Sequence, residues 1–181
     1  AVTFSIAFSD SAGNAGTALT SGTGSVTVDT TAPASFTVGT VQSTGGTVKS
    51  GYWNATNTGL DITLNLANDS TLVGGTIQLL VRQTAESPTP WSSATNLDSA
   101  YTIQSGDING SKTLSVTSTV FEGLSIFIEN FTMEFNATIT DSAGNATTGT
   151  ASSSLIVIDQ TAPSFSSVAA TDDAYKAGDV I

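Results

Sequence analysis

The chain contains no cysteine and no histidine among its 181 residues. Without cysteine it can form no disulfide, no thiolate zinc site and no cysteine nucleophile. Without histidine it lacks the commonest transition-metal ligand and general base. These two absences exclude most hydrolase and redox mechanisms, and we expect a protein that is not an enzyme.

Basic residues are also scarce, because 4 Lys and Arg stand against 15 Asp and Glu, for a formal net charge of −11. Such a charge repels phosphate backbones and anionic lipid, which argues against a nucleic-acid partner. Only 10% of the residues are charged, and Ser, Thr, Asn and Gly supply most polar positions. This composition suits an extracellular protein. No apolar run reaches the ~20 residues of a membrane span, so we expect no membrane insertion in this segment.

The beginning and the end of the chain contain two copies of one passage. Residues 8–33 read FSDSAGNAGTALTSGTGSVTVDTTAP, and residues 139–163 read ITDSAGNATTGTASSSLIVIDQTAP. Asp10 aligns with Asp141 at an offset of 131. A period this long is typical of whole domains in tandem, not of a short solenoid repeat.

The two passages end alike, with DTTAP at residues 29–33 and DQTAP at residues 159–163, at an offset of 130. A Lys-x-Gly follows each of them, within residues 48–51 and 175–178. We therefore expect tandem repeats of about 130 residues. The chain then divides into the last two strands of a preceding repeat in residues 1–33, one complete repeat in residues 34–163 and the opening strand of a following repeat in residues 164–181.

Apolar and polar residues alternate with a period of two along several stretches, which is typical of half-buried strands. The clearest stretches are residues 60–66, 77–81 and 131–135. Clusters of Gly, Asn, Asp and Ser separate the strands, and no amphipathic helix stands between them. We predict an all-β, immunoglobulin-like sandwich of two antiparallel sheets, with about seven or eight strands in residues 34–163. Residues 120–128 could form one helical turn.

The alternation also assigns side chains to the core of the sandwich. We expect its inward face to hold Ile62, Leu64, Ile77, Leu79, Phe135 and Ile139. A slip of one residue would reverse every side chain, so the outward face holds Asp61, Thr63 and Gln78. In the first passage, Phe4, Ile6 and Phe8 occupy the positions of Phe135, Ala137 and Ile139, and we expect them to face the core of a preceding repeat.

Two groups of motifs resemble a known family. DSAGN in the last hairpin, followed after a Val-rich strand by D-x-TAP, is similar to the tandem bacterial immunoglobulin-like repeats of giant surface adhesins and biofilm proteins. GYWNATNTGLDITL and NDSTLVGGTIQL also resemble repeats of very long cell-surface proteins of the Bacteroidetes. The resemblance implies an extracellular spacer or stalk module that extends a distal binding region and bears force. Its partners would be neighbouring repeats and, in a filament, adjacent copies.

The junction between repeats is the best candidate for a metal site. In an immunoglobulin-like domain the turn between the last two strands lies at the end where the chain enters, so residues 141–145 should face residues 29–33. Asp29, Asp141 and Asn145 would then bring carboxylate and amide oxygens together, and hard oxygen ligands select Ca²⁺. The resemblance also implies calcium at interdomain joints. The equivalent residues of neighbouring junctions are Asp10, Asn14 and Asp159.

The same residues also make a good turn without any metal. An Asp at the start of D-S-A-G-N accepts backbone N–H groups two or three residues on, while Gly or Asn takes a positive φ. Asp29 and Asp159 can likewise cap a strand end before the proline. The sequence leaves both interpretations open.

Other side chains offer further candidate sites. Trp53 and Trp91 could stack on a sugar, which would make the chain a carbohydrate-binding or accessory module of a secreted glycan-active enzyme, the rival to the spacer. Tryptophan in a sandwich more often packs at the rim of the core. Glu122, Glu129 and Glu134 lie close in sequence, but we expect them to be solvated rather than catalytic. Asn-x-Ser/Thr triplets abound in so Thr-rich a chain. The resemblance implies O-glycan acceptors in Asp-Ser motifs, at Ser11, Ser70, Ser99 and Ser142.

Overall fold

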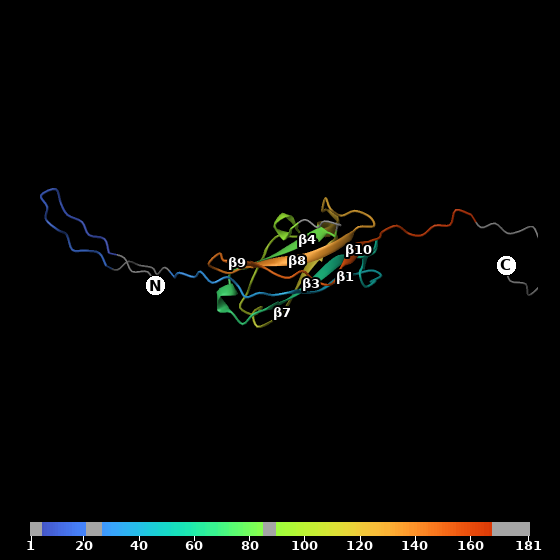
Figure 1. Cartoon of the computed structure of the whole chain (residues 1–181), viewed down its shortest axis with the longest axis horizontal. Helices are drawn as coiled ribbons and strands as arrows, with labels where there is room; N and C mark the ends of the chain where they lie inside the picture. The colour runs from blue at the N-terminus through green and yellow to red at the C-terminus, as the bar shows by residue number, and fades with distance from the viewer. Residues whose placement is uncertain (1–4, 21–26, 85–89, 168–181) are drawn as a thin grey trace, which may run out of the picture.

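The computed structural model describes residues 5–20, 27–84 and 90–167. Within these ranges the chain forms two β-sheets that enclose one hydrophobic core, with only short helical turns between the strands (Figure 1). The predicted all-β sandwich is confirmed. Among the described residues, no helix combines the length and the apolar character needed to cross a membrane.

The smaller sheet has the strand order β1-β3-β7. These strands are β1 (Val38–Thr44), β3 (Gly59–Leu66) and β7 (Gly110–Thr117). The larger sheet runs β2-β10-β8-β4-β5, with β6 also paired to β4 and β9 to β8. These strands are β2 (Tyr52–Trp53), β4 (Thr76–Gln83), β5 (Thr95–Asn96), β6 (Tyr101–Thr102), β8 (Thr132–Thr140), β9 (Ala146–Thr148) and β10 (Ile156–Ile158). The helical turns are η1 (Ser70–Leu72), η2 (Trp91–Ser93) and α1 (Ser118–Glu122).

The predicted core is confirmed at each of the six positions. In β3, every second side chain from Leu60 to Leu66 is buried, whereas Asp61 and Thr63 are partly exposed. This alternation follows from the pleat of a strand, in which successive side chains point to opposite faces of the sheet. The six predicted residues are all less than 5% exposed, at Ile62, Leu64, Ile77, Leu79, Phe135 and Ile139.

Each sheet contains one long antiparallel pairing. β3 pairs with β7 from Gly59↔Thr117 to Leu66↔Gly110. β4 pairs with β8 along its whole length, and an ion pair of 2.7 Å between Arg82 and Glu134 links these strands on the outer face. Long, regular ladders of this kind are the part of a sandwich that alternation in the sequence can locate.

Two details of the strand arrangement differ from the prediction. The described residues contain ten strands, because pieces of two or three residues, such as β2 and β5, add to the long ones. The sheets are also not purely antiparallel. After β1 the chain crosses from the smaller sheet to the edge of the larger one, where β2 lies parallel to β10 with Tyr52 opposite Val157 and Trp53 opposite Ile158.

The helical turn α1 closes one side of the core between β7 and β8. Thr117 caps its N-terminus by accepting the N–H of Val120, and the turn ends at Gly123. The prediction placed this turn in residues 120–128, and the helix begins slightly earlier. Phe121 points inward, is fully buried, and stacks edge-on against Trp53 with ring centroids 4.9 Å apart. This contact fixes Trp53 in the core.

Candidate functional site

Residues 141–145 form the tight turn that joins β8 to β9. The Asp141 carboxylate accepts the backbone N–H groups of Ala143 and Asn145 and the side-chain amide of Asn145, each at 2.9 Å. Gly144 takes a φ of 99°, which glycine adopts without strain. The bonds, led by that from the Asn145 side chain, hold the pKa of the Asp141 carboxyl below its ordinary value.

The same turn is built a second time at the N-terminal end of the chain. Asp10 accepts the backbone N–H groups of Ala12 and Asn14, both at 2.9 Å, and the Asn14 side-chain amide at 2.8 Å. Gly13 takes a φ of 87°. The Asn14 side chain is again the main cause of a lowered carboxyl pKa, here at Asp10. The motif therefore folds in the same way in both copies.

Beside this first turn the pairing has the register of β8 and β9, and it shifts by one residue further from the turn, where Ile6 bridges Leu19. Ser9 bridges Ala15, as Thr140 pairs with Ala146 in the sandwich. These pairs lie 131 positions apart, which is the offset between the sequence copies. The two hairpins thus share sequence and turn geometry, and they share register beside the turn.

The N-terminal hairpin exposes the face that its counterpart buries. Ile6 and Phe8 are 56% and 61% exposed, whereas the aligned Ala137 and Ile139 are 0% and 3% exposed. The hairpin stands apart from the sandwich in Figure 1. Phe4, the third residue predicted to share this face, lies outside the described residues.

The segment that enters the sandwich, residues 29–33, runs directly beside the β8–β9 turn. We call it the incoming segment. Asn145 Nδ2 donates to the backbone oxygen of Asp29 at 3.2 Å. Thr147 Oγ1 donates to the backbone oxygen of Pro33 at 2.6 Å, and Pro33 is buried. The predicted contact between the turn and this segment is therefore confirmed.

The three residues predicted to bind calcium do not form an oxygen cage in this geometry. Both carboxylate oxygens of Asp141 accept N–H groups, and Asn145 turns its N–H side toward Asp29. The Asp29 carboxylate accepts the N–H of Thr31 at 3.0 Å. Ca²⁺ takes about six to eight oxygen ligands, which this donor set does not supply. The part of the chain that the structure describes contains no cluster of three or more His, Cys, Asp or Glu able to hold a metal. Calcium at this junction stays a prediction.

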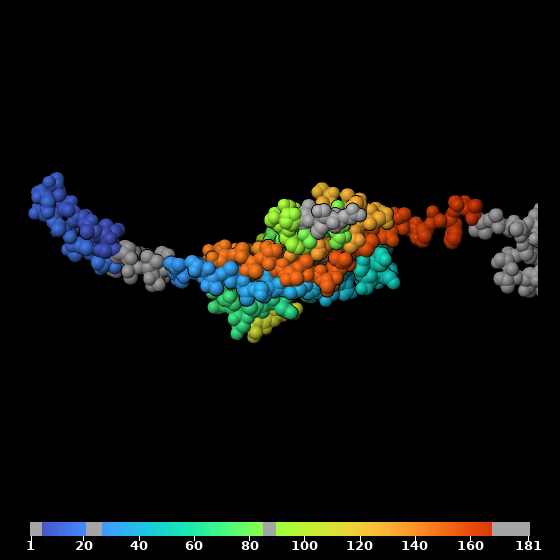
Figure 2. Space-filling view, in the orientation of Figure 1, coloured from blue at the N-terminus to red at the C-terminus, as the bar shows by residue number. Residues whose placement is uncertain are grey.

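The segment that leaves the sandwich, residues 159–163, emerges at the opposite end (Figure 2). We call it the outgoing segment. The Glu129 carboxylate accepts the N–H of Gln160 at 3.0 Å and that of Thr161 at 3.1 Å. These bonds, with Gln160 first, lower the pKa of Glu129. Glu122 accepts the side-chain amide of Gln160 at 2.8 Å. The domain thus holds the chain as it leaves.

The three glutamates are accessible to solvent, as expected, with Glu122 exposed and Glu129 and Glu134 partly exposed, but each also makes hydrogen bonds or ion pairs within the protein. Glu129 binds the outgoing segment, and Glu134 forms the ion pair with Arg82. Glu122 also accepts the indole N–H of Trp53 at 3.0 Å. The role of Glu129 could not be found by comparing the two sequence copies, because the passage that they share begins downstream of it, at residue 139. An acidic residue shortly before the last strands was the only local signal.

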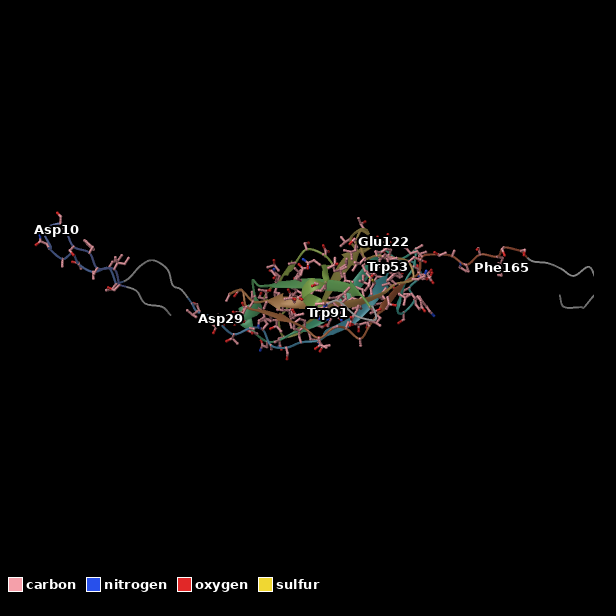
Figure 3. All side chains as sticks on the ribbon, turned by 45° about the horizontal axis from the view of Figure 1, so that its top comes forward. Asp10, Asp29, Trp53, Trp91, Glu122 and Phe165 are labelled. Carbon is pink, nitrogen blue, oxygen red and sulfur yellow. The ribbon has the colours of Figure 1, made fainter. Side chains whose placement is uncertain are left out.

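The two tryptophans do not form a platform for a sugar. Trp53 is fully buried, so its ring presents no face to a ligand. Trp91 lies apart from it in Figure 3, is half-buried, and has the guanidinium of Arg82 over its ring at 4.0 Å. Sugar stacking at Trp53 is therefore excluded, and the ring of Trp91 is already covered on one face.

The serines proposed as O-glycan acceptors are all accessible. Each of the four is exposed, at Ser11, Ser70, Ser99 and Ser142. Their modification stays a prediction. Among the Asn-x-Ser/Thr triplets, Asn136 is fully buried and donates its amide to the backbone oxygen of Gly149 at 2.9 Å, which excludes it as an acceptor in the folded protein.

A polar cluster ties β6 to β7 at the side of the sandwich. Asp107 accepts the Tyr101 hydroxyl at 2.7 Å, the N–H of Gln104 at 2.8 Å and the Lys112 ammonium at 2.9 Å. The Lys112 ammonium also donates to the Tyr101 hydroxyl at 2.8 Å. The Gln104 N–H, followed by Lys112 and Tyr101, lowers the pKa of Asp107 from 3.8 to about 2. Every polar atom here has a partner within the cluster, which is typical of a structural tie.

We expect Asp107→Asn to lower the free energy of unfolding by about 1.5 kcal/mol at pH 7, because charge-assisted hydrogen bonds are lost. A carboxyl whose folded pKa is depressed stabilises the fold above its unfolded pKa, here 3.8, and loses that effect as pH falls through about 2. The difference between variant and parent should therefore shrink as pH falls through this window. Urea unfolding at several pH values measures it, with Asp61→Asn as a control. A pH-independent difference would contradict the prediction.

Comparison with known proteins adds no relatives. The chain matches no protein-family model and no curated protein sequence. A functional proposal therefore has to be based on the geometry of the two ends of the sandwich.

Proposed function

We propose that this chain is a structural spacer, one repeat and parts of its neighbours from a long extracellular or cell-surface adhesin or filament. The observation that carries the proposal is the placement of the chain ends. The incoming and outgoing segments have nearly the same sequence, DTTAP and DQTAP, and leave the sandwich at opposite ends (Figure 2). Copies joined through this sequence would follow one another in a line.

The exposure of the outgoing segment supports the proposal. Pro33 is buried and Phe36 packs against the core at the incoming end. Beyond the outgoing end, the aligned Pro163 is exposed, and Phe165 is 94% exposed and lies clear of the sandwich in Figure 3. Pro163 therefore has the sequence context of Pro33 without the surface that Pro33 packs on, and Phe165 stands two residues after it, where Phe36 stands three residues after Pro33. A following repeat would supply that surface.

The N-terminal hairpin gives matching support from the other side. Its exposed Ile6 and Phe8 repeat a face that the sandwich buries, as expected of the last strands of a preceding immunoglobulin-like domain. The rival proposal, a carbohydrate-binding module, depended on Trp53 and Trp91, and Trp53 is fully buried. The spacer is therefore the better supported function.

The test is whether length grows in proportion to the number of repeats. Residues 34–163 are added once or twice directly after Pro163 of the full chain, and small-angle X-ray scattering measures the maximum dimension. Each copy should add about 30 Å for strands of some nine residues and at most about 17 Å for the linker. An addition that leaves the maximum dimension nearly unchanged would mean that the repeats fold back on each other, and would refute the spacer.

A further inference from the structure

The sandwich holds both of its connecting segments, and it does so through different backbone groups. At the outgoing end, Glu129 accepts the N–H groups of Gln160 and Thr161, the second and third residues of DQTAP. At the incoming end, Asn145 and Thr147 donate to the carbonyl groups of the first and fifth residues of DTTAP. The domain thus binds backbone N–H groups of the outgoing segment and backbone carbonyl groups of the incoming segment.

Because the two segments are copies of one sequence, the two sets of bonds can be placed on a single linker. No backbone group bound by Glu129 is then also bound by Asn145 or Thr147. The peptide group between the first and second residues would be bound on both sides, its N–H by Glu129 of one repeat and its carbonyl by Asn145 of the next. The N–H and C=O of a trans peptide point in opposite directions, so the two repeats approach the linker from opposite sides without competing.

The N–H group of the third residue of the segment has a different hydrogen-bond acceptor at each end of the sandwich. At the incoming end the N–H of Thr31 is bonded to its own neighbour, the Asp29 carboxylate, at 3.0 Å. At the outgoing end the aligned N–H of Thr161 is bonded to Glu129 at 3.1 Å. The same donor therefore has two acceptors in this sequence, and the glutamate of the repeat being left replaces the local aspartate.

We propose that each D-x-T-A-P linker is a two-sided clamp. The partner it serves is a second copy of the repeat: Glu129 of the repeat being left holds the linker N–H groups, and Asn145 and Thr147 of the repeat being entered hold its carbonyls. The inference rests on the proposed function, since it needs repeats in tandem. The clamp fixes the angle between neighbours by hydrogen bonds alone and needs no metal ion.

The clamp brings the ends of neighbouring repeats close together. Two hydrogen bonds and the width of one peptide group separate the Glu129 carboxylate from the Asn145 amide of the next repeat, which amounts to at most about 9 Å. At that separation the domains nearly touch, and the five-residue linker has little freedom to bend. The joint is short and stiff.

The test uses the full chain with residues 34–163 repeated once after Pro163, so that one linker joins two complete domains. Ser99→Cys in both copies provides two spin-label sites, because Ser99 is exposed and the chain has no other cysteine. Pulsed dipolar spectroscopy then measures the distribution of distances between the domains. All samples are measured with a chelator and again with calcium.

Two substitutions remove one side of the clamp each. Glu129→Ala in the first copy removes the acceptor of the N–H groups, and Thr147→Val in the second copy removes the hydroxyl while preserving the shape of the side chain. Each should broaden the distance distribution about twofold, as a clamped linker becomes a flexible one. The matched controls, Asp61→Ala in the first copy and Thr148→Val in the second, make their hydrogen bonds within one domain and should leave the width unchanged.

The outcomes separate the clamp from the spacer. An elongated protein with a distribution that neither Glu129→Ala nor Thr147→Val broadens would overturn the clamp and leave the spacer standing. A distribution that is narrow only with calcium would assign the stiffness to a metal and also overturn the clamp. A short mean distance in the unsubstituted protein would overturn the spacer itself. Melting curves confirm that each variant is folded, and a variant with an unchanged melting temperature and a broadened distribution supports the clamp.

Discussion

Replacing Trp53 with alanine should lower the free energy of unfolding by about 3 to 5 kcal/mol, the usual cost of deleting a large aromatic side chain from a core. The ring is fully buried and meets Phe121 and Phe127 edge-on, at centroid distances of 4.9 and 6.4 Å. The substitution also removes the hydrogen bond to Glu122. Since domains of this size are stable by only about 5 to 15 kcal/mol, the variant should be close to unfolding at room temperature.

Urea unfolding followed by far-ultraviolet circular dichroism measures this loss without depending on tryptophan fluorescence. Trp91→Ala is the matched control, because Trp91 is half-buried and the guanidinium of Arg82 lies over its ring at 4.0 Å. The control should cost about 1 kcal/mol or less. If the two substitutions lowered the free energy of unfolding equally, the burial of Trp53 would not be what determines its contribution to stability.

The second large effect is expected at Gly75, immediately before β4. A Cβ atom at this position would overlap the backbone oxygen of Thr140 and lie 2.8 Å from the backbone carbon of Asp141. Neither neighbour is a side chain that can rotate away, so β4 and β8 would have to separate. We expect Gly75→Ala to destabilise the domain by about 3 kcal/mol.

Gly106→Ala is the control for this substitution. Gly106 has no atom within 4 Å of the position a Cβ would take, and its backbone is outside the left-handed region. This variant should be neutral or more stable by up to about 1 kcal/mol, because alanine restricts the unfolded chain. Thermal unfolding measures the melting temperatures of both variants and of the parent. Similar melting temperatures for Gly75→Ala and the parent would mean that the close approach of β4 and β8 is not needed.

The long strands could be predicted from the sequence because their burial depends on a local rule. A strand with one face on the core alternates in polarity, and β3 shows this alternation from Leu60 to Leu66. β2 has two residues, which is too short to show a period, and its parallel pairing depends on where β10 lies. The full burial of Trp53 could not be predicted for the same reason, since Phe121 and Phe127 cover it from a distant part of the chain.

The features of the candidate site also differ in whether a local motif or a distant part of the chain determines them. The turn at residues 141–145 is made by five consecutive residues, so its motif predicts its geometry wherever it occurs, and the copy that begins at Asp10 folds alike. The contact of Asn145 with Asp29 followed from the expected topology. The bond of Glu129 to Gln160 spans 31 positions and has no sequence motif, so only the structure reveals it.

The opposite placement of the two segments determines how the sandwich would respond to tension. A pull on residues 29–33 and 159–163 acts along β1 and β10, which run with the long axis in Figure 1. Hydrogen bonds of an antiparallel ladder lie perpendicular to the strands, so such a load shears many of them together instead of opening them one at a time. Forced unfolding depends on the height of this barrier and not on equilibrium stability. The antiparallel pairing of β1 with β3, and of β10 with β8, would therefore set the load that the domain could carry under such a pull.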